Sequence, residues 1–226
     1  MSSESTTARF KKAVTISLYF VAFIWLLKCL DWFTPLELRL LGIYPRDISH
    51  LPSIFVAPLI HGSFSHISTN TPALIVLGTS LLFGYPKAAR YVIPLIWLLS
   101  GLGVWLFARS SLHFGASGLT FGMMFFVFTV GALRWDPRAI ALSCIVFFLY
   151  GGMIWGIFPT EPGISFEYHF FGAAVGVASA FLFKNLDPPP FQKKYSWEFE
   201  DDLDDSDPYW LENRRSPNLN DDRDSA

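Results

Sequence analysis

The stretch Gly115-Ala-Ser-Gly-Leu-Thr-Phe-Gly-Met-Met-Phe-Phe-Val-Phe-Thr-Val-Gly-Ala-Leu133 contains no charged residue. A bilayer core of about 30 Å requires about 20 predominantly apolar residues in helical form, so this stretch is long enough to cross a membrane. Its first turn is nevertheless small and polar, because Ser117 lies between Ala116 and Gly118. The sequence therefore predicts a transmembrane helix over residues 115–133 with an unusual N-terminal end.

Five further apolar runs of similar length flank this stretch. They cover residues 13–30, 65–83, 88–107, 138–158 and 166–183. The first run is longer than the apolar region of a signal peptide, and no small-residue cleavage site follows it. The run over 65–83 is the weakest, because Asn70 and Pro72 interrupt it. We therefore expect an all-α polytopic membrane protein, a bundle of six transmembrane helices.

The composition agrees with a lipid bilayer as the main partner. Hydrophobic residues make up 52% of the 226 residues and charged residues 16%, against about 25% charged residues in soluble domains. This excludes a soluble enzyme and a nucleic-acid binder with a basic patch. The two cysteines provide no disulfide framework and no CxxC spacing.

Charge divides the chain into a membrane core and an acidic tail. Residues 195–226 have a net charge of −8 and the rest +6. We expect a cytoplasmic N-terminal segment (1–12), a membrane core (13–186) with an interfacial first loop (31–60), and a disordered acidic tail (187–226). Ten Lys and Arg residues lie on the side of the two termini and four on the other side. This bias predicts cytoplasmic termini in a cell membrane, and we expect a prokaryotic one.

Polar side chains gather at one membrane surface. With this topology the second, fourth and sixth spans all begin on the outer side, where they carry His66 and Asn70, Ser117, and His169. Polar side chains inside a membrane are costly and usually functional. His66 and Asn70 are four residues apart and share a helix face. Ser117 is expected in the first turn of its helix, where free backbone N–H groups can stabilise an anion.

Glycine spacing predicts which helices cross closely. Four glycines on the fourth and sixth spans have the spacing that lets helix backbones approach in membranes: Gly118, Gly122, Gly172 and Gly176. A close crossing would bring His169 beside Ser117, and a serine next to a histidine is the minimal activated nucleophile. Glu167 is two residues from His169 and lies on another face. A Ser–His dyad is therefore expected, without a third acidic member.

These motifs resemble those of the rhomboid family of intramembrane serine proteases. Gly115-Ala-Ser117-Gly118 is similar to the family's GxSG motif, and the other two matches are His169-x-x-Gly172-x-x-x-Gly176 and His66-x-x-x-Asn70. They occur in the family's order, and the resemblance covers about residues 13–186. It implies a rhomboid-like bundle that cleaves transmembrane segments of membrane-protein substrates, with no cofactor and no metal.

The resemblance also implies a role for each matching residue. Ser117 would be the nucleophile and His169 the general base, while His66, Asn70 and the Ser117 N–H would form the oxyanion hole. Structural or helix-packing roles are expected for a further set: His61, Gly115, Gly118, Phe121, Gly172 and Gly176. Substrate would enter between the second and fifth spans, under a cap formed by residues 159–165.

The sequence departs from the family pattern at three places. Tyr168 replaces an alanine that often precedes the histidine, and Phe121 replaces a tyrosine that often stacks on it. The first loop lacks the usual Trp-Arg pair. Loop architecture, activity and substrate choice depend on these differences, while the dyad does not. His113 and Arg109 are expected to be interfacial residues.

Three other functions compete with proteolysis. A catalytically weak or inactive relative that binds membrane clients would have lost the serine or the histidine, and both are present. A metal-binding protein could use the histidines, but no HExxH motif and no paired carboxylates accompany them. A transporter would place its polar residues near the membrane midplane. The natural substrate, the cleavage site, the role of the tail and the oligomeric state stay open.

Overall fold

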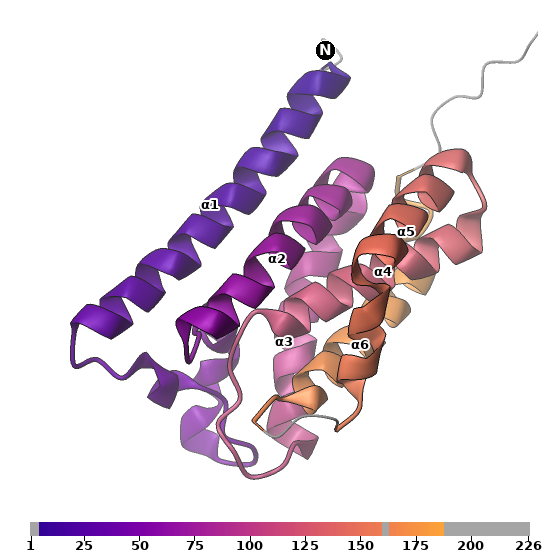
Figure 1. Cartoon of the computed structure of the whole chain (residues 1–226). Helices are drawn as coiled ribbons and strands as arrows, with labels where there is room; N and C mark the ends of the chain where they lie inside the picture. Colours follow the sequence, from indigo (N-terminus) through magenta and orange to yellow (C-terminus); the bar gives the residue numbers. More distant parts are fainter. Residues whose placement is uncertain (1–4, 160–162, 188–226) are drawn as a thin grey trace, which may run out of the picture. The chain divides into compact units, whose positions relative to one another are not determined.

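The computed structural model describes residues 5–159 and 163–187. Within these residues there is no strand, and six helices are long and apolar enough to cross a membrane. The α-helices, shown in Figure 1, are α1 (Thr6–Phe33), α2 (Phe64–Gly84), α3 (Pro86–Phe107), α4 (Ser117–Arg134), α5 (Pro137–Tyr150) and α6 (Phe166–Phe183). The predicted all-α fold with six spans is confirmed.

The helix bounds differ from the predicted spans at two places. α1 begins well before residue 13, because the Ser5 hydroxyl accepts a hydrogen bond from the Ala8 N–H at 3.2 Å and caps the helix. α5 ends at Tyr150, and the fifth span continues as the 3₁₀ helix η5 (Gly151–Ile157). By contrast, Pro72 does not interrupt the second span, which is one continuous helix. Residues 160–162 of the predicted cap lie outside the residues that the structure describes. The same is true of the predicted acidic tail after Asp187.

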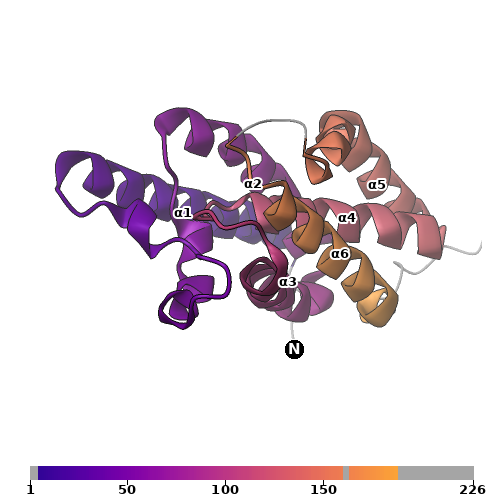
Figure 2. The same ribbon diagram turned by 90° about the horizontal axis from the view of Figure 1, so that it is seen from below.

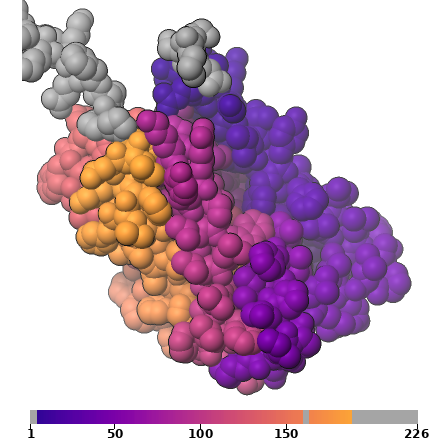
Figure 3. All heavy atoms as spheres, turned by 180° about the vertical axis from the view of Figure 1, so that it is seen from behind, coloured from indigo at the N-terminus to yellow at the C-terminus, as the bar shows by residue number. Residues whose placement is uncertain are grey.

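The first loop packs against α3 by means of short helices. It contains the 3₁₀ helices η1 (Leu38–Leu41), η2 (Ile48–His50), η3 (Pro52–Phe55) and η4 (Ala57–Leu59). The Trp105 indole N–H donates to the Asp47 carbonyl at 2.8 Å, and the Arg46 N–H donates to the Trp105 carbonyl at 2.8 Å. Figure 3 shows this loop beside α3, with α6 on the other side of α3. The loop is thus fixed to a transmembrane helix.

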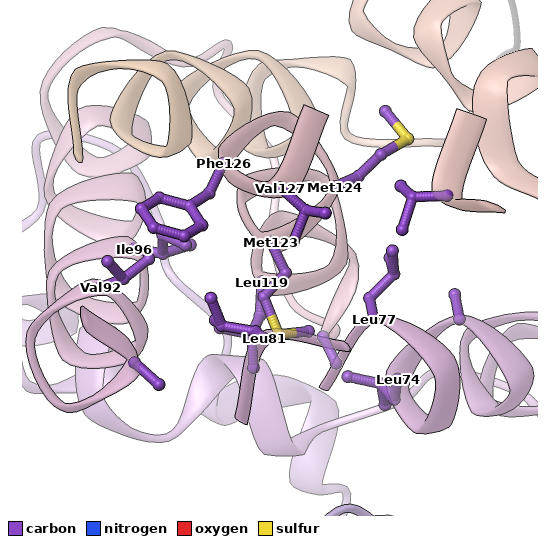
Figure 4. Close-up of a cluster of buried hydrophobic side chains, with 14 of the residues drawn as sticks. Leu74, Leu77, Leu81, Val92, Ile96, Leu119, Met123, Met124, Phe126 and Val127 are labelled. Atoms are coloured by element: carbon purple, nitrogen blue, oxygen red, sulfur yellow. The ribbon is translucent and has the colours of Figure 1, made fainter. Parts of the chain in front are cut away.

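Helix α4 lies among the other helices and contacts α2, α3, α5 and α6 (Figure 2). Figure 4 shows the buried cluster around it, which joins Leu77 of α2, Ile96 of α3, and Phe126 and Val127 of α4. Lipid tails are as apolar as these side chains, so close packing, and not removal from water, stabilises such contacts in a membrane. The tight packing of α4 therefore holds the serine at its N-terminus in a fixed position.

Helices α4 and α6 cross at two glycine pairs. A Cβ atom on Gly172 would collide with the backbone carbonyl of Gly118, and one on Gly176 with that of Gly122. Only a hydrogen atom fits at these points, so the two backbones touch. This close approach brings the first turns of α4 and α6 to the same end of the bundle (Figure 1).

Candidate active site

Ser117 is the first residue of α4, and the residue is 9% exposed. The preceding turn requires Gly115, whose φ is +114° and whose position leaves no room for a Cβ next to the His66 ring. The first intrahelical bond runs from the Thr120 N–H to the Ala116 carbonyl, at 3.0 Å. The backbone N–H of Ser117 therefore has no helical carbonyl to bond, as is usual in a first turn.

His169 lies in the first turn of α6 and is held on two sides. Its ring is stacked on Phe121, with centroids 4.1 Å apart and an angle of 6° between the planes. Its Nδ1 atom is 2.9 Å from the Gly156 carbonyl of η5. Because a carbonyl can only accept, Nδ1 carries the proton and Nε2 keeps its lone pair. The imidazole is therefore in the tautomer that a general base needs.

The structure brings the four predicted polar residues to one cavity. The cavity has a volume of about 790 Å³, and Ser117, His169, His66 and Asn70 all line it. Residues on both sides of the undescribed segment 160–162, such as Met153 and Ile164, contribute further walls. A serine, a histidine and two potential hydrogen-bond donors thus share one space, although they come from three different helices.

Asn70 and His66 lie on one face of α2. The Asn70 amide donates one hydrogen to the His66 carbonyl at 3.1 Å, which fixes the side chain and leaves a second amide hydrogen. The Ser63 hydroxyl caps α2 by accepting from the His66 N–H at 3.0 Å. The Asn70 side chain is therefore oriented by its own helix before any substrate arrives, and the helix start that carries His66 is capped.

His61 lies behind His66 and does not line the cavity. The two rings meet edge to face with centroids 5.1 Å apart, and the His61 Nε2 atom accepts a hydrogen bond from the Ala116 N–H at 3.4 Å. Burial, with a smaller contribution from His66, lowers the pKa of His61 to about 4. A neutral imidazole is what this bond requires, so His61 supports the turn that precedes Ser117.

Two polar residues near the dyad occupy positions that the sequence did not indicate. His113, which we expect at the interface, is buried within the protein, with 1% of the residue exposed. Its Nδ1 atom is 2.6 Å from the Ser165 hydroxyl. Glu167 forms an ion pair with Arg109, with Oε1 and Nε 3.6 Å apart. The Nδ1 atom of His169 bonds Gly156, which agrees with a dyad that has no acidic member.

The departures from the family pattern have structural consequences. Tyr168 is 1% exposed, and its ring lies so close to Gly118 that a Cβ there would be 2.5 Å from it. Phe121 stacks on His169 without a hydroxyl to donate. Among the described residues, no group of three or more His, Cys, Asp or Glu side chains is arranged to hold a metal ion.

Comparison with known proteins gives the family. A family model described as Rhomboid domain matches residues 49–185. The chain belongs to the rhomboid family. The matched part contains the four predicted site residues that line the cavity. With six helices able to cross a membrane, this rhomboid is a multi-pass membrane protein.

Relatives occur among mycobacteria. The uncharacterized protein Rv1337 of Mycobacterium tuberculosis is 34% identical over 177 residues, which cover 74% of each chain. The uncharacterized protein Mb1372 of Mycobacterium bovis shows the same identity and coverage. The uncharacterized protein ML1171 of Mycobacterium leprae is 33% identical over 181 residues, 75% of this rhomboid and 70% of the relative.

Proposed function

We propose that this rhomboid is an intramembrane serine endopeptidase that cleaves transmembrane segments of membrane proteins. The observation that carries the proposal is that Ser117 and His169 line one cavity and that the Gly156 carbonyl holds the Nδ1 proton of the histidine. The Nε2 lone pair is then available to take the serine proton. The family assignment supports the same chemistry.

The reaction proceeds by acyl transfer. The Ser117 Oγ attacks the scissile carbonyl while His169 Nε2 takes the hydroxyl proton, and a tetrahedral oxyanion forms. When the C–N bond breaks, His169 gives this proton to the leaving amine. A water molecule then attacks the acyl-enzyme, His169 takes a proton from it, and the serine is released with that proton. The stacked Phe121 ring keeps the imidazole plane fixed during both transfers.

The oxyanion is stabilised by donors that are already oriented. The Ser117 backbone N–H, the free amide hydrogen of Asn70 and the His66 side chain are the three that we assign to it. The first two belong to groups whose other bonds fix their direction. Preorganised donors cost no reorganisation when the charge develops, which is why they contribute so much to catalysis.

The substrate is a transmembrane segment that reaches the cavity between α2 and α5. Thr69 and Ala73 of α2 and Tyr150 of α5 line the cavity from the two sides of this entrance. The outer surface of α5 is strongly apolar, with Phe148 89% exposed, as suits a helix in contact with lipid. We further propose that the protein resides in a cell membrane with both termini in the cytoplasm.

The decisive experiment is labelling of the purified protein in detergent with a fluorophosphonate probe. The wild-type protein should be labelled and should cleave a transmembrane substrate, whereas Ser117→Ala and His169→Ala should do neither. Ser65→Ala is the matched control, because Ser65 lines the same cavity outside the dyad and should label normally. Equal behaviour of all four proteins, or a folded wild type that neither labels nor cleaves, would favour a client-binding protein without catalysis.

A further inference from the structure

A partly buried hydrogen bond joins two residues that precede the dyad. His113 lies four residues before Ser117 and Ser165 four residues before His169, and the His113 Nδ1 and Ser165 Oγ atoms are 2.6 Å apart. We propose that His113 and Ser165 are a positioning pair that sets the separation between the nucleophile and the base. The inference rests on the proposed function and adds residues to it.

The His113 backbone is fixed to the first loop. Its N–H donates to the Ile43 carbonyl at 2.9 Å, and its carbonyl accepts from the Ile43 N–H at 2.8 Å. Two residues later, the Gly115 N–H donates to the Ala57 carbonyl at 2.9 Å. The connection that leads into Ser117 is therefore tied to an element that is itself bonded to α3 through Trp105.

Ser165 holds the first turn of α6. Its hydroxyl accepts from the Tyr168 N–H at 3.2 Å, and its carbonyl lies 3.3 Å from the His169 nitrogen and accepts that N–H. A movement of Ser165 would thus change the direction of the turn that carries His169. Since His113 binds the same hydroxyl, the cap of α6 is attached to the connection that carries Ser117.

The proton positions in this chain of bonds follow from chemistry. The His113 Nε2 atom is 3.0 Å from the Arg109 carbonyl, which can only accept, so Nε2 carries the ring proton. Nδ1 must then accept from the Ser165 hydroxyl, whose oxygen accepts from the Tyr168 N–H. Burial lowers the pKa of His113, in agreement with a neutral ring. Each donor in this chain of bonds therefore faces an acceptor.

A second set of contacts also holds the first turn of α6. Arg109 donates to the Ile164 carbonyl and pairs with Glu167, both within or next to the first turn of α6. A variant without the pair should therefore still fold. Its defect should lie in the alignment of the dyad, and a misplacement of 1 Å in an active site can reduce the rate about 100-fold.

The test uses the full-length protein in detergent with a transmembrane substrate. We expect Ser165→Ala and His113→Phe each to lower kcat and the rate of fluorophosphonate labelling about 10- to 100-fold, with KM changed less than about twofold. The double variant should be no slower than His113→Phe, because both single changes remove the His113–Ser165 bond and only His113→Phe also removes the bond to the Arg109 carbonyl. Ser165→Thr, which keeps the hydroxyl, should restore most of the rate.

Ser143→Ala is the matched control. It removes a different buried bond between helices, from the Ser143 hydroxyl to the Val127 carbonyl at 2.8 Å, and should lower thermal stability without changing kcat. If Ser165→Ala behaves in the same way, the positioning pair is refuted. This result differs from failure of the proposed function, which would appear as a wild type with no turnover.

A readout without catalysis completes the test. ¹⁵N NMR of histidine-labelled protein, assigned by comparison with His113→Phe, reports which ring nitrogen is protonated. We expect His113 to carry its proton on Nε2 and to accept at Nδ1. A mixture of the two tautomers, as in a ring without fixed partners, would overturn the pair whatever the activity of the protein.

Discussion

Asn70 uses one of its two amide hydrogens within its own helix and has one left for the cavity. If that hydrogen stabilises the oxyanion, Asn70→Ala should lower kcat about 100-fold or more and change KM little, because the bond forms only in the transition state. Steady-state cleavage of a transmembrane substrate measures both constants.

Thr69→Val is the matched control for Asn70. Thr69 also lines the cavity, and its hydroxyl also donates to the His66 carbonyl, at 2.9 Å. Valine has nearly the same shape as threonine. Thr69→Val should therefore leave kcat within about threefold of wild type, since no oxyanion donor is lost. Equal losses in the two variants would show that the His66 carbonyl bonds, and not the free amide hydrogen, explain the effect.

The lowered pKa of His61 predicts that the fold is less stable in acid. Its pKa is about 4 in the folded protein and about 6.5 in an unfolded chain, so only the unfolded state takes up the proton between these values. Stability should therefore be complete above about pH 6.5 and fall as the pH decreases towards 4, by on the order of 3 kcal/mol from this residue.

Thermal unfolding in detergent between pH 4 and 7 measures this effect. His61→Gln retains an oxygen that can accept the Ala116 N–H and has no ionisable ring. Its melting temperature should depend less on pH than that of the wild type. An unchanged pH dependence in this variant would show that other groups, such as the buried His113, cause the acid sensitivity.

At the scale of elements, the close crossing of α4 and α6 determines how near Ser117 and His169 lie to each other. Gly176→Ala would place a methyl group against the Gly122 carbonyl. Alanine favours a helix by about 1 kcal/mol over glycine, whereas overpacking typically costs 1–3 kcal/mol, and here the obstacle is backbone that cannot rotate away. We expect net destabilisation, a lower melting temperature, and weaker fluorophosphonate labelling because the helices separate.

Gly152→Ala provides the comparison. Gly152 lies in η5, and a Cβ there would have no atom within 4 Å among the described residues. This variant should melt within about 1–2 °C of the wild type, as expected for a surface change of less than 0.5 kcal/mol. A similar loss in both variants would indicate that glycine replacement, and not the helix crossing, causes the effect.

At the scale of the whole molecule, orientation depends on the distribution of Lys and Arg in the loops. We expect a fluorescent protein fused after Ala226 to fluoresce in the cytoplasm, and alkaline phosphatase fused there to be inactive. Alkaline phosphatase inserted after Tyr44, in the first loop, should be active because it would reach the outer side. The reverse pattern would invert the topology and place the cavity at the cytoplasmic surface.

Local information was sufficient for the spans and for the family motifs. Hydropathy over 18 or more residues depends on neighbouring residues only, so all six spans could be predicted, although the ends of α1 and α5 could not. A cap such as Ser5 and the change to a 3₁₀ helix after Tyr150 involve single hydrogen bonds. Such bonds hardly affect a hydropathy average, so helix ends are the least predictable part of the fold.

The chemistry of the chain alone thus specified an all-α membrane protein and four of the polar residues that line the cavity, because their types and spacing are properties of the sequence. Tertiary structure decided which groups surround His169, the proposed general base. The Gly156 carbonyl that orients His169 is a backbone group, which every residue has, and the His113–Ser165 bond joins positions 52 residues apart. Neither leaves a periodic signal, since each depends on how α6 packs against η5 and the turn before α4, and only the folded chain brings those segments together.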